Sequence, residues 1–134
     1  MVYPELKNKV VIVTGGGRGI GRAFCLGFSA NGSRVVVADI DWRDASNTVD
    51  EVKRRGGQAI AIQVDVTNFD EVQNMATRTL EVFGGVDVLV NNAALVGDLE
   101  LKPWDKISPE EWDRVLRVNV TGMFYCVRAV VPYM

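Results

Sequence analysis

The chain has 134 residues, a formal net charge of −2 and 48% apolar residues. That length fits one domain with a hydrophobic core, and scattered charges without a basic stripe argue against a nucleic-acid partner. Histidine is absent, which removes His-based catalytic triads and most catalytic zinc sites, so we expect no metal site.

No apolar run reaches the ~20 residues that span a membrane, and the first residues lack a signal-peptide core. Cys25 and Cys126 form no C-x-x-C pair, so we expect a cytoplasmic protein with reduced, buried thiols.

Four apolar segments alternate with helical segments along the chain. Near-continuous Val and Ile predict strands of a parallel sheet covered on both faces, and these strands are expected at 10–13, 35–38, 59–64 and 86–90. Helices are expected between them at about 19–31, 43–55 and 69–83. Glycines follow each of these helices, as is common at helix C-termini. The alternation predicts an α/β fold, in which four βα units form a doubly wound parallel sheet within a single domain, residues 1–134.

The last segment predicts a long helix. Ser108-Pro109-Glu110-Glu111 is a capping-box sequence with proline at the first helical position. We expect the helix to run to about Tyr133. An apolar stripe lies along one of its faces at helical spacing, and Asn119 falls on that stripe. The stripe consists of Trp112, Leu116, Met123, Val127 and Val130.

Residues 14–21, T-G-G-G-R-G-I-G, connect the first strand to the first helix. A helix N-terminus presents unpaired N–H groups and about half a positive charge, and glycine lets an anion approach that backbone closely. The loop fits neither G-x-G-x-x-G nor a P-loop, but it has the spacing G-x-x-x-G-x-G. The alternative is a glycine-rich turn that binds nothing. The predicted phosphate-binding turn consists of Gly15, Gly17, Arg18, Gly19, Ile20 and Gly21.

Asp39 ends the second strand, 20 residues after Gly19. An acid at this place accepts hydrogen bonds from the hydroxyls of an adenosine ribose, and the adjacent Ile40 is expected to line the same site. A 2′-phosphate about 4 Å away would be repelled by roughly 4 kcal/mol at an effective dielectric of 20. We therefore expect NAD rather than NADP, although Arg18 could pair with a 2′-phosphate. A solvated loop acid is the alternative for Asp39.

Two further strand ends carry candidate ligand-binding residues. Asp65, followed by Val66, could accept a hydrogen bond from the exocyclic amine of adenine, or it could simply be an acid near the start of the next helix. The fourth strand ends in Asn91-Asn92-Ala93-Ala94. Its alanines leave room for a ligand, and we single out Asn91 and Ala93. Ligands of open α/β sheets bind outside the carboxyl ends of the strands, where all these segments fall.

Together these motifs resemble the short-chain dehydrogenase/reductase (SDR) family, and the resemblance extends from Lys9 to the end of the chain. The segment R-V-N-V-T-G at 117–122 belongs to the same pattern. The resemblance implies a Rossmann fold and an NAD(P)-dependent oxidoreductase that acts on small-molecule alcohols or ketones, usually as a homo-oligomer. Ala94 departs from the family, which usually has glycine there.

The resemblance also implies a role for each matching residue. Gly15, Gly19 and Gly21 would form the pyrophosphate turn, and Ile20 would lie near the nicotinamide. Asp39 would hold the adenosine ribose, Asp65 and Val66 the adenine, and Asn91 the ribose region of the cofactor. Asn119 matches the catalytic asparagine, which holds a water in a proton relay. Without the resemblance, an asparagine bonded to its own helix is an equal alternative.

The family's catalytic serine and its Tyr-x-x-x-Lys pair come later in the family than Met134. Tyr3 and Lys7 have that spacing, but they precede the first strand and lie far from the carboxyl end of the expected sheet. We therefore expect the 134 residues to be the cofactor-binding half of a longer protein and to be inactive alone. Two other classes remain: a non-catalytic dinucleotide-binding module, and a methyltransferase-like nucleotide binder.

Overall fold

The computed structural model describes residues 3–96 and 101–134 and contains a four-stranded parallel sheet. The strand order is β3-β2-β1-β4. The strands are β1 (Val10–Thr14), β2 (Arg34–Asp39), β3 (Gln58–Gln63) and β4 (Val88–Val90). This arrangement confirms the predicted α/β fold with a doubly wound parallel sheet.

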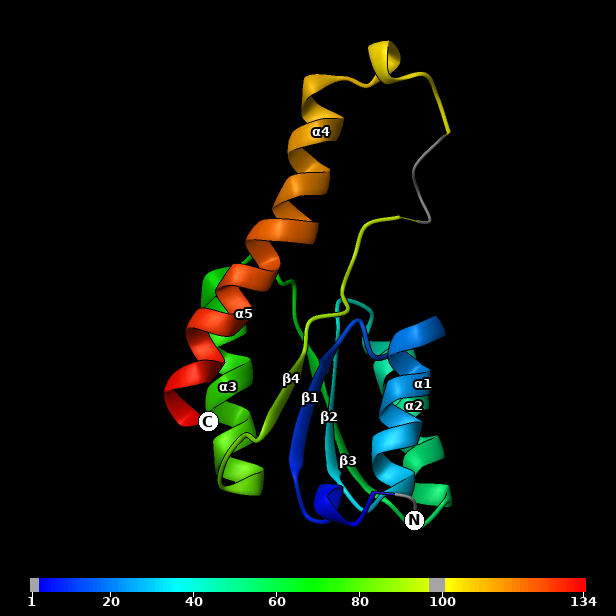
Figure 1. Cartoon of the computed structure of the whole chain (residues 1–134), viewed down its shortest axis with the longest axis vertical. Helices are drawn as coiled ribbons and strands as arrows, with labels where there is room; N and C mark the ends of the chain where they lie inside the picture. Colours follow the sequence, from blue (N-terminus) through cyan, green and yellow to red (C-terminus); the bar gives the residue numbers. More distant parts are fainter. Residues whose placement is uncertain (1–2, 97–100) are drawn as a thin grey trace.

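Helices cover both faces of the sheet (Figure 1). Two of them, α1 (Gly19–Ala30) and α2 (Trp42–Arg54), lie on one face. The other face carries α3 (Phe69–Phe83) and α5 (Gly122–Val130). Successive side chains of a strand point to opposite faces, so Val11 packs in the core under α1 and α2, whereas Ile12 packs in the core under α3 and α5.

Polar side chains fix the starts of the helices that follow β2 and β3. The Asp41 side chain caps α2 by accepting hydrogen bonds from the N–H groups of Arg43 and Asp44. The Asn68 side chain caps α3 in the same way, with the N–H groups two and three residues further on as donors. Gly84 ends α3 with a left-handed φ of 82°, and its N–H donates to the carbonyl of Leu80 at 2.8 Å. The predicted helix boundaries are therefore set by local capping.

The long final helix has the predicted extent but is not continuous. It consists of α4 (Pro109–Leu116), a π-helical turn (Arg117–Thr121), α5 and a 3₁₀ turn (Val131–Tyr133). Two further 3₁₀ turns occupy Pro4–Leu6 and Trp104–Lys106. Figure 1 shows α4 projecting beyond the carboxyl ends of the strands.

The apolar stripe predicted on this helix is mostly exposed, because small residues rather than large ones pack against the body. Trp112 and Met123 are exposed, whereas Gly122 and Cys126 are buried. A Cβ built at Gly122 would lie 2.7 Å from a methyl carbon of Val66, so only glycine permits this close approach. Val130 is the one member of the stripe, among the described residues, that is fully buried.

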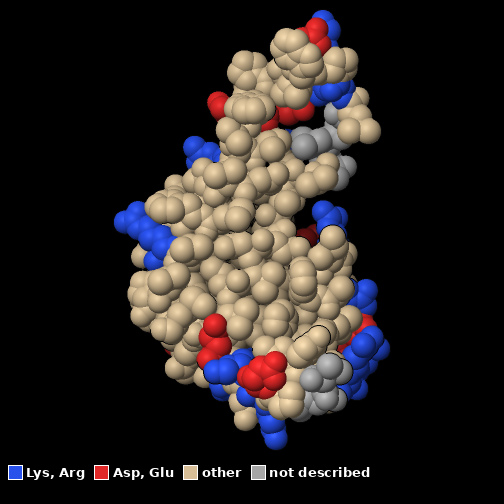
Figure 2. Space-filling view, in the orientation of Figure 1, with Lys and Arg blue, Asp and Glu red and all other residues tan. Residues whose placement is uncertain are grey.

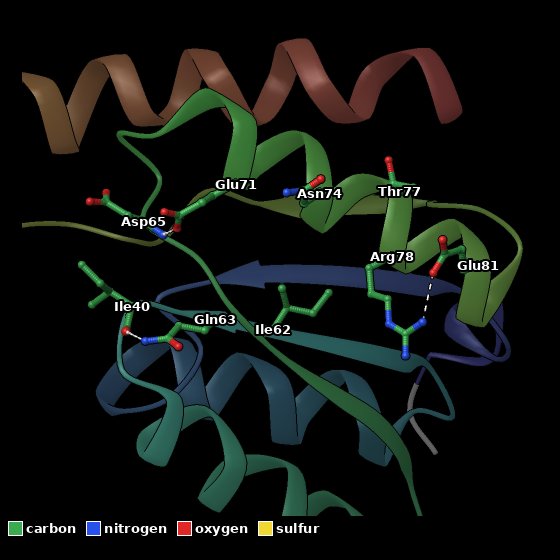
Figure 3. A pocket seen from close by; sticks show the side chains of 9 residues that line it. All are labelled: Ile40, Ile62, Gln63, Asp65, Glu71, Asn74, Thr77, Arg78 and Glu81. Atoms are coloured by element: carbon green, nitrogen blue, oxygen red, sulfur yellow. Dashed lines mark hydrogen bonds and ion pairs between the residues drawn. The ribbon is translucent and has the colours of Figure 1, made fainter.

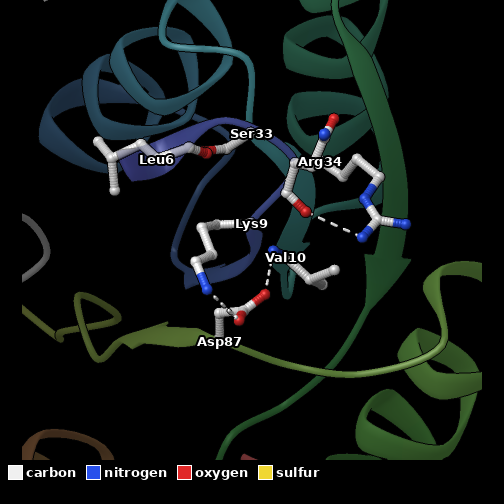
Figure 4. Close-up of polar contacts among 7 residues, drawn as sticks. Leu6, Lys9, Val10, Ser33, Arg34 and Asp87 are labelled. Carbon is white, nitrogen blue, oxygen red and sulfur yellow. Dashed lines mark hydrogen bonds and ion pairs between the residues drawn. The ribbon is translucent and has the colours of Figure 1, made fainter. Parts of the chain in front are cut away.

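The amino end of the sheet is held by charged side chains (Figure 4). Asp87 accepts hydrogen bonds from the N–H of Val10 at 2.8 Å and from Lys9 Nζ at 3.0 Å. Arg34 donates to the carbonyl of Asn8 at 2.9 Å. Lys7 lies in this N-terminal segment, before β1, so the Tyr-x-x-x-Lys spacing at residues 3–7 falls at the end of the sheet away from the strands' carboxyl ends.

Charges of both signs lie at the margins of the face in Figure 2, and no basic stripe crosses that face. Within the residues that the structure describes, no helix combines the length and the hydropathy that crossing a membrane requires.

Candidate functional site

A cleft of about 510 Å³ opens at the carboxyl ends of the strands. It is bounded by the loop after β1, the ends of β2 and β3, the segment after β4 and the π-helical turn. The structure thus brings together four of the segments that the sequence analysis singled out. The predicted residues that line the cleft are Gly15, Arg18, Ile20, Gly21, Asp39, Ile40, Asp65, Val66 and Ala93.

The glycine loop between β1 and α1 is tightly packed. A Cβ at Gly21 would lie 1.9 Å from the carbonyl oxygen of Gly15, and a Cβ at Gly15 would lie 3.0 Å from Ala93 Cα and from Asn92 Nδ2. Gly19 starts α1 with φ of +54° and has no atom within 4 Å of its Cβ position, so open space lies beside the helix start. Gly19 does not itself line the cleft, but it begins the helix that faces it.

The first turn of α1 carries no side-chain cap. Its N-cap residue, Arg18, accepts no hydrogen bond through its side chain, and no acidic residue lies in the first turn. By contrast, Asp41, Asn68 and Ser108 cap α2, α3 and α4. The N–H groups at the start of α1 are therefore available to an anion in the cleft.

Asp39 is the buried acid of the cleft, with 8% of its surface exposed. Its Oδ2 accepts the N–H of Gly17 at 2.9 Å, and its Oδ1 accepts the N–H of Asp41 at 3.0 Å. Gly17 does not line the cleft and contributes through this contact. Each carboxylate oxygen has room for a further donor, so Asp39 can hold a hydroxyl-bearing ligand while remaining fixed to the backbone.

Asn92, rather than Asn91, lines the cleft. Its Nδ2 donates to the carbonyls of Thr14 at 3.0 Å and of Gly15 at 3.1 Å. Thr14 Oγ1 in turn accepts the N–H groups of Asn92 at 3.0 Å and Ala93 at 3.1 Å. Adjacent residues of an extended segment point in opposite directions, so the cleft lining includes Asn92, whereas the predicted cofactor contact at Asn91 stays a prediction. Asn91 is half-buried outside the cleft lining.

Asp65 lies at the start of the turn into α3 and also at the cleft. Its Oδ1 accepts the N–H of Thr67 at 2.8 Å and the Thr67 hydroxyl at 2.7 Å, which forms the turn that leads into α3. Its own N–H donates to Glu71 Oε2 at 2.8 Å. Asp65 also lines the cleft, and its Oδ2 makes no hydrogen bond to another described residue, so one oxygen remains for a ligand.

Asn119 lies at the middle of the π-helical turn and does not bond to its own helix through its side chain. Its Oδ1 accepts the N–H of Leu95 at 2.7 Å, and its Nδ2 donates to the Leu95 carbonyl at 3.4 Å. Asn119 thereby ties the segment after β4 to the final helix. It is not a cleft-lining residue, whereas its neighbour Val118 is. Isolated π-helical turns are frequent at functional sites.

The cysteines take no part in the cleft. Both are free and buried, as predicted. Burial raises the pKa of the Cys25 thiol to about 12 and that of Cys126 to about 11. Cys25 Sγ donates to the carbonyl oxygen of Gly16 at 3.7 Å, so this thiol contacts the buried side of the glycine loop.

A second hollow, of about 790 Å³, runs along the edge strand β3 beside α3 (Figure 3). It shares only Ile40 and Asp65 with the cleft. Figure 3 shows Arg78 lying over this edge, where it pairs with Glu81 at 3.0 Å. This hollow contains no part of the glycine loop, so the cleft, and not the larger hollow, is the candidate functional site.

The chain matches the family model described as short chain dehydrogenase over residues 9–134, and it belongs to that family. It is 43% identical, over 123 residues, to an uncharacterized oxidoreductase of Thermotoga maritima. The matched region covers 92% of this chain and 47% of that relative. The chain therefore spans about half the length of the curated relatives it matches.

Two solved structures share the fold. A 3-ketoacyl-(acyl-carrier-protein) reductase from Brucella melitensis, complexed with NADH, is 32% identical with a TM-score of 0.88 and matches 96% of this chain and 50% of its own. A short chain dehydrogenase/reductase from Burkholderia phymatum, in complex with NAD, is 38% identical with a TM-score of 0.87 and matches 97% of this chain and 45% of its own. The neighbours support a nicotinamide dinucleotide as the kind of cofactor that this fold holds.

Proposed function

We propose that residues 1–134 form the cofactor-binding domain of an NAD-dependent short-chain oxidoreductase. The observation that carries the proposal is the pairing of an uncapped helix start with a buried, backbone-anchored carboxylate in one cleft. The loop with Gly15, Gly19 and Gly21 would bind the pyrophosphate through backbone N–H groups. Gly15 and Gly21 let the loop pack without room for a Cβ, and open space lies beside Gly19 at the uncapped helix start, so the residues present fit such a group.

The remaining cleft residues divide the rest of the cofactor among them. Asp39, with Ile40 beside it, would hold the adenosine ribose, and Asp65 with Val66 would hold the adenine through the free Oδ2 of Asp65. Ile20 and Ala93 would lie toward the nicotinamide end. Asn91 is proposed to contact the ribose region of the cofactor, and Asn92, which lines the cleft, is a further candidate for the same contact.

Asp39 favours NAD over NADP. A 2′-phosphate close to a carboxylate that two backbone N–H groups hold in place would be repelled by up to roughly 4 kcal/mol, less what solvent and rearrangement relieve. Arg18 lines the same cleft but is exposed, so it is free to face solvent when no phosphate is present. The expected result is at least a tenfold preference for NADH over NADPH, about 1.4 kcal/mol.

The proposed reaction transfers a hydride between the nicotinamide and the carbonyl carbon of a small-molecule alcohol or ketone, and the cofactor supplies that hydride chemistry when bound. This chain's own residues bind and orient the dinucleotide. Asn119 is proposed to hold a water of the proton relay while its side chain fixes Leu95. No Tyr-x-x-x-Lys lies near the cleft in the described residues 3–96 and 101–134, so we expect this chain alone to be inactive, at least about 10²- to 10⁴-fold below a complete enzyme.

We also propose that the full-length protein is a homo-oligomer. In the single chain, α4 and α5 expose large apolar side chains, among them Trp112, Phe124 and Val127. Exposed apolar patches of this kind mark interaction surfaces. Light scattering after size-exclusion chromatography of the full-length protein tests the proposal, and a monomer at micromolar concentration would refute it.

Calorimetry tests the cofactor proposal and separates it from the alternatives. NADH should bind with a stoichiometry of one and NADPH more weakly, whereas S-adenosylmethionine should give no heat; a signal from S-adenosylmethionine alone would favour a methyltransferase-like binder. Asp39→Ala should weaken the binding of NADH and reduce the preference for NADH over NADPH. A full-length protein that binds NADH, lacks any Tyr-x-x-x-Lys after Met134 and oxidises no alcohol would be a non-catalytic dinucleotide-binding module.

A further inference from the structure

A buried chain of hydrogen bonds connects α2 to the acid of the cleft. Thr48 Oγ1 donates to the carbonyl oxygen of Gly17 at 2.9 Å, and the N–H of Gly17 donates to Asp39 Oδ2 at 2.9 Å. Thr48 is fully buried, with 0% of its surface exposed. The backbone of Gly17 is therefore held from both sides: the Asp39 carboxylate accepts its N–H, and the Thr48 hydroxyl of α2 donates to its carbonyl, which belongs to the next peptide unit.

The hydroxyl of Thr48 is used in an unusual way for a residue in the middle of a helix. Such hydroxyls commonly donate to the carbonyl four residues earlier in their own helix, and Thr79 of α3 does so, to Met75 at 2.8 Å. Thr48 instead reaches a carbonyl 31 residues earlier in the chain. Its bond therefore does not support α2 but fixes the loop.

Close packing makes this contact specific. A Cβ at Gly17 would lie 2.7 Å from Asp44 Cβ, 2.9 Å from the backbone N of Ala45 and 2.9 Å from Asp39 Oδ2. The Gly17 backbone thus fits between the start of α2 and Asp39 with no room for a side chain. The orientation of this backbone depends on the partners of the Gly17 carbonyl and of the Gly17 N–H, since a buried carbonyl that loses its hydrogen-bond partner is destabilised unless it turns toward another donor.

We propose that Thr48 is a positioning residue for the adenosine ribose: by fixing the backbone of Gly17 it sets the direction in which the Asp39 carboxylate presents its oxygens. The proposal rests on the proposed function, because the ribose is the ligand that Asp39 is inferred to hold. Thr48 itself does not line the cleft. Its effect on binding passes entirely through Asp39.

The test compares Thr48→Val, which deletes the hydroxyl and keeps the shape, with Thr48→Ser, which keeps the hydroxyl. Calorimetry should show NADH binding weakened about 3- to 10-fold by Thr48→Val, the range expected for one net hydrogen bond, and restored to within about twofold of the wild type by Thr48→Ser. Thr79→Val is the matched control, because it deletes a buried helix hydroxyl remote from the cleft, and it should leave NADH affinity unchanged. Thr48→Ala deletes the same hydroxyl if the valine variant does not fold.

A cycle with Asp39→Ala separates positioning from a general structural effect. If Thr48 acts through Asp39, Thr48→Val should change NADH affinity less than twofold in the Asp39→Ala background, because coupled residues are not additive. An equal loss in both backgrounds, or an equal loss in Thr48→Ser, would overturn the proposal. If the wild type itself binds no NADH, the proposed function fails; if it binds and Thr48→Val binds equally well, only the present inference fails.

Discussion

The glycine loop predicts a sharp contrast between two glycines of the same helix. In α1, a Cβ at Gly21 would lie 1.9 Å from the carbonyl oxygen of Gly15 and 2.6 Å from Asn92 Nδ2, whereas a Cβ at Gly27 would meet no atom within 4 Å. Both residues are helical, so both substitutions by alanine gain about 1 kcal/mol of helix propensity. Only Gly21→Ala must also displace the loop.

The size of the effect follows from that geometry. To restore an ordinary contact of about 3.4 Å, the Gly15 backbone must move by about 1.5 Å away from the new Cβ. Overpacking of this kind costs about 3 kcal/mol. After the gain of about 1 kcal/mol in helix propensity, Gly21→Ala should be less stable than the wild type by about 2 kcal/mol. For a domain of this size, 1 kcal/mol corresponds to about 4 °C in Tm. The Tm of Gly21→Ala should therefore fall by about 8 °C, whereas the Tm of Gly27→Ala should rise by about 4 °C.

Thermal unfolding followed by circular dichroism measures both shifts, and calorimetry measures NADH binding by the same samples. Gly21→Ala should lose more than tenfold in NADH affinity, and Gly27→Ala should bind as the wild type does. If Gly21→Ala were as stable as Gly27→Ala and bound NADH equally well, the close packing of the loop would not be what fits it to a pyrophosphate.

Two further predictions concern groups outside the cleft. The N–H of Val10, and secondarily Lys9, hold the pKa of Asp87 below its ordinary value. A carboxyl whose folded pKa is lowered stabilises the fold above the unfolded pKa of about 3.9. In urea unfolding, Asp87→Ala should therefore be less stable than the wild type at pH 6, with the difference shrinking as the pH falls below about 4; a difference that grows on acidification would contradict this. Because burial raises the pKa of Cys25 to about 12 and of Cys126 to about 11, neither thiol should react with a thiol-reactive disulfide dye at pH 8 until denaturant is added, and rapid labelling of the native protein would show that these thiols are not buried.

The sequence predicted the sheet well because its signals are local. Runs such as Val10–Val13 are apolar enough to be buried on both faces, and a capping side chain or a glycine marks the ends of α2 and α3. The observed strands and helices therefore lie within a few residues of those expected, and the carboxyl ends of the strands carry the predicted polar residues.

The parts that the sequence did not predict depend on tertiary contacts. No spacing rule distinguishes Asn91 from Asn92, because the choice depends on which residue faces the Thr14 carbonyl. The π-helical turn at 117–121 was also not predicted, since its sequence has ordinary helical spacing. Likewise, the burial of Gly122 against Val66 reverses the usual rule that large apolar residues face the core.

The most direct test of the account is an amide-resolved NMR titration of the chain with NADH. Saturable shifts should be largest for the backbone signals of Gly15, Gly19 and Asp39, and negligible for Asn74 and Thr77, which line the separate hollow beside β3. No shifts in the glycine loop, or shifts confined to that hollow, would contradict the claim that the cleft at the carboxyl ends of the strands binds a nicotinamide dinucleotide.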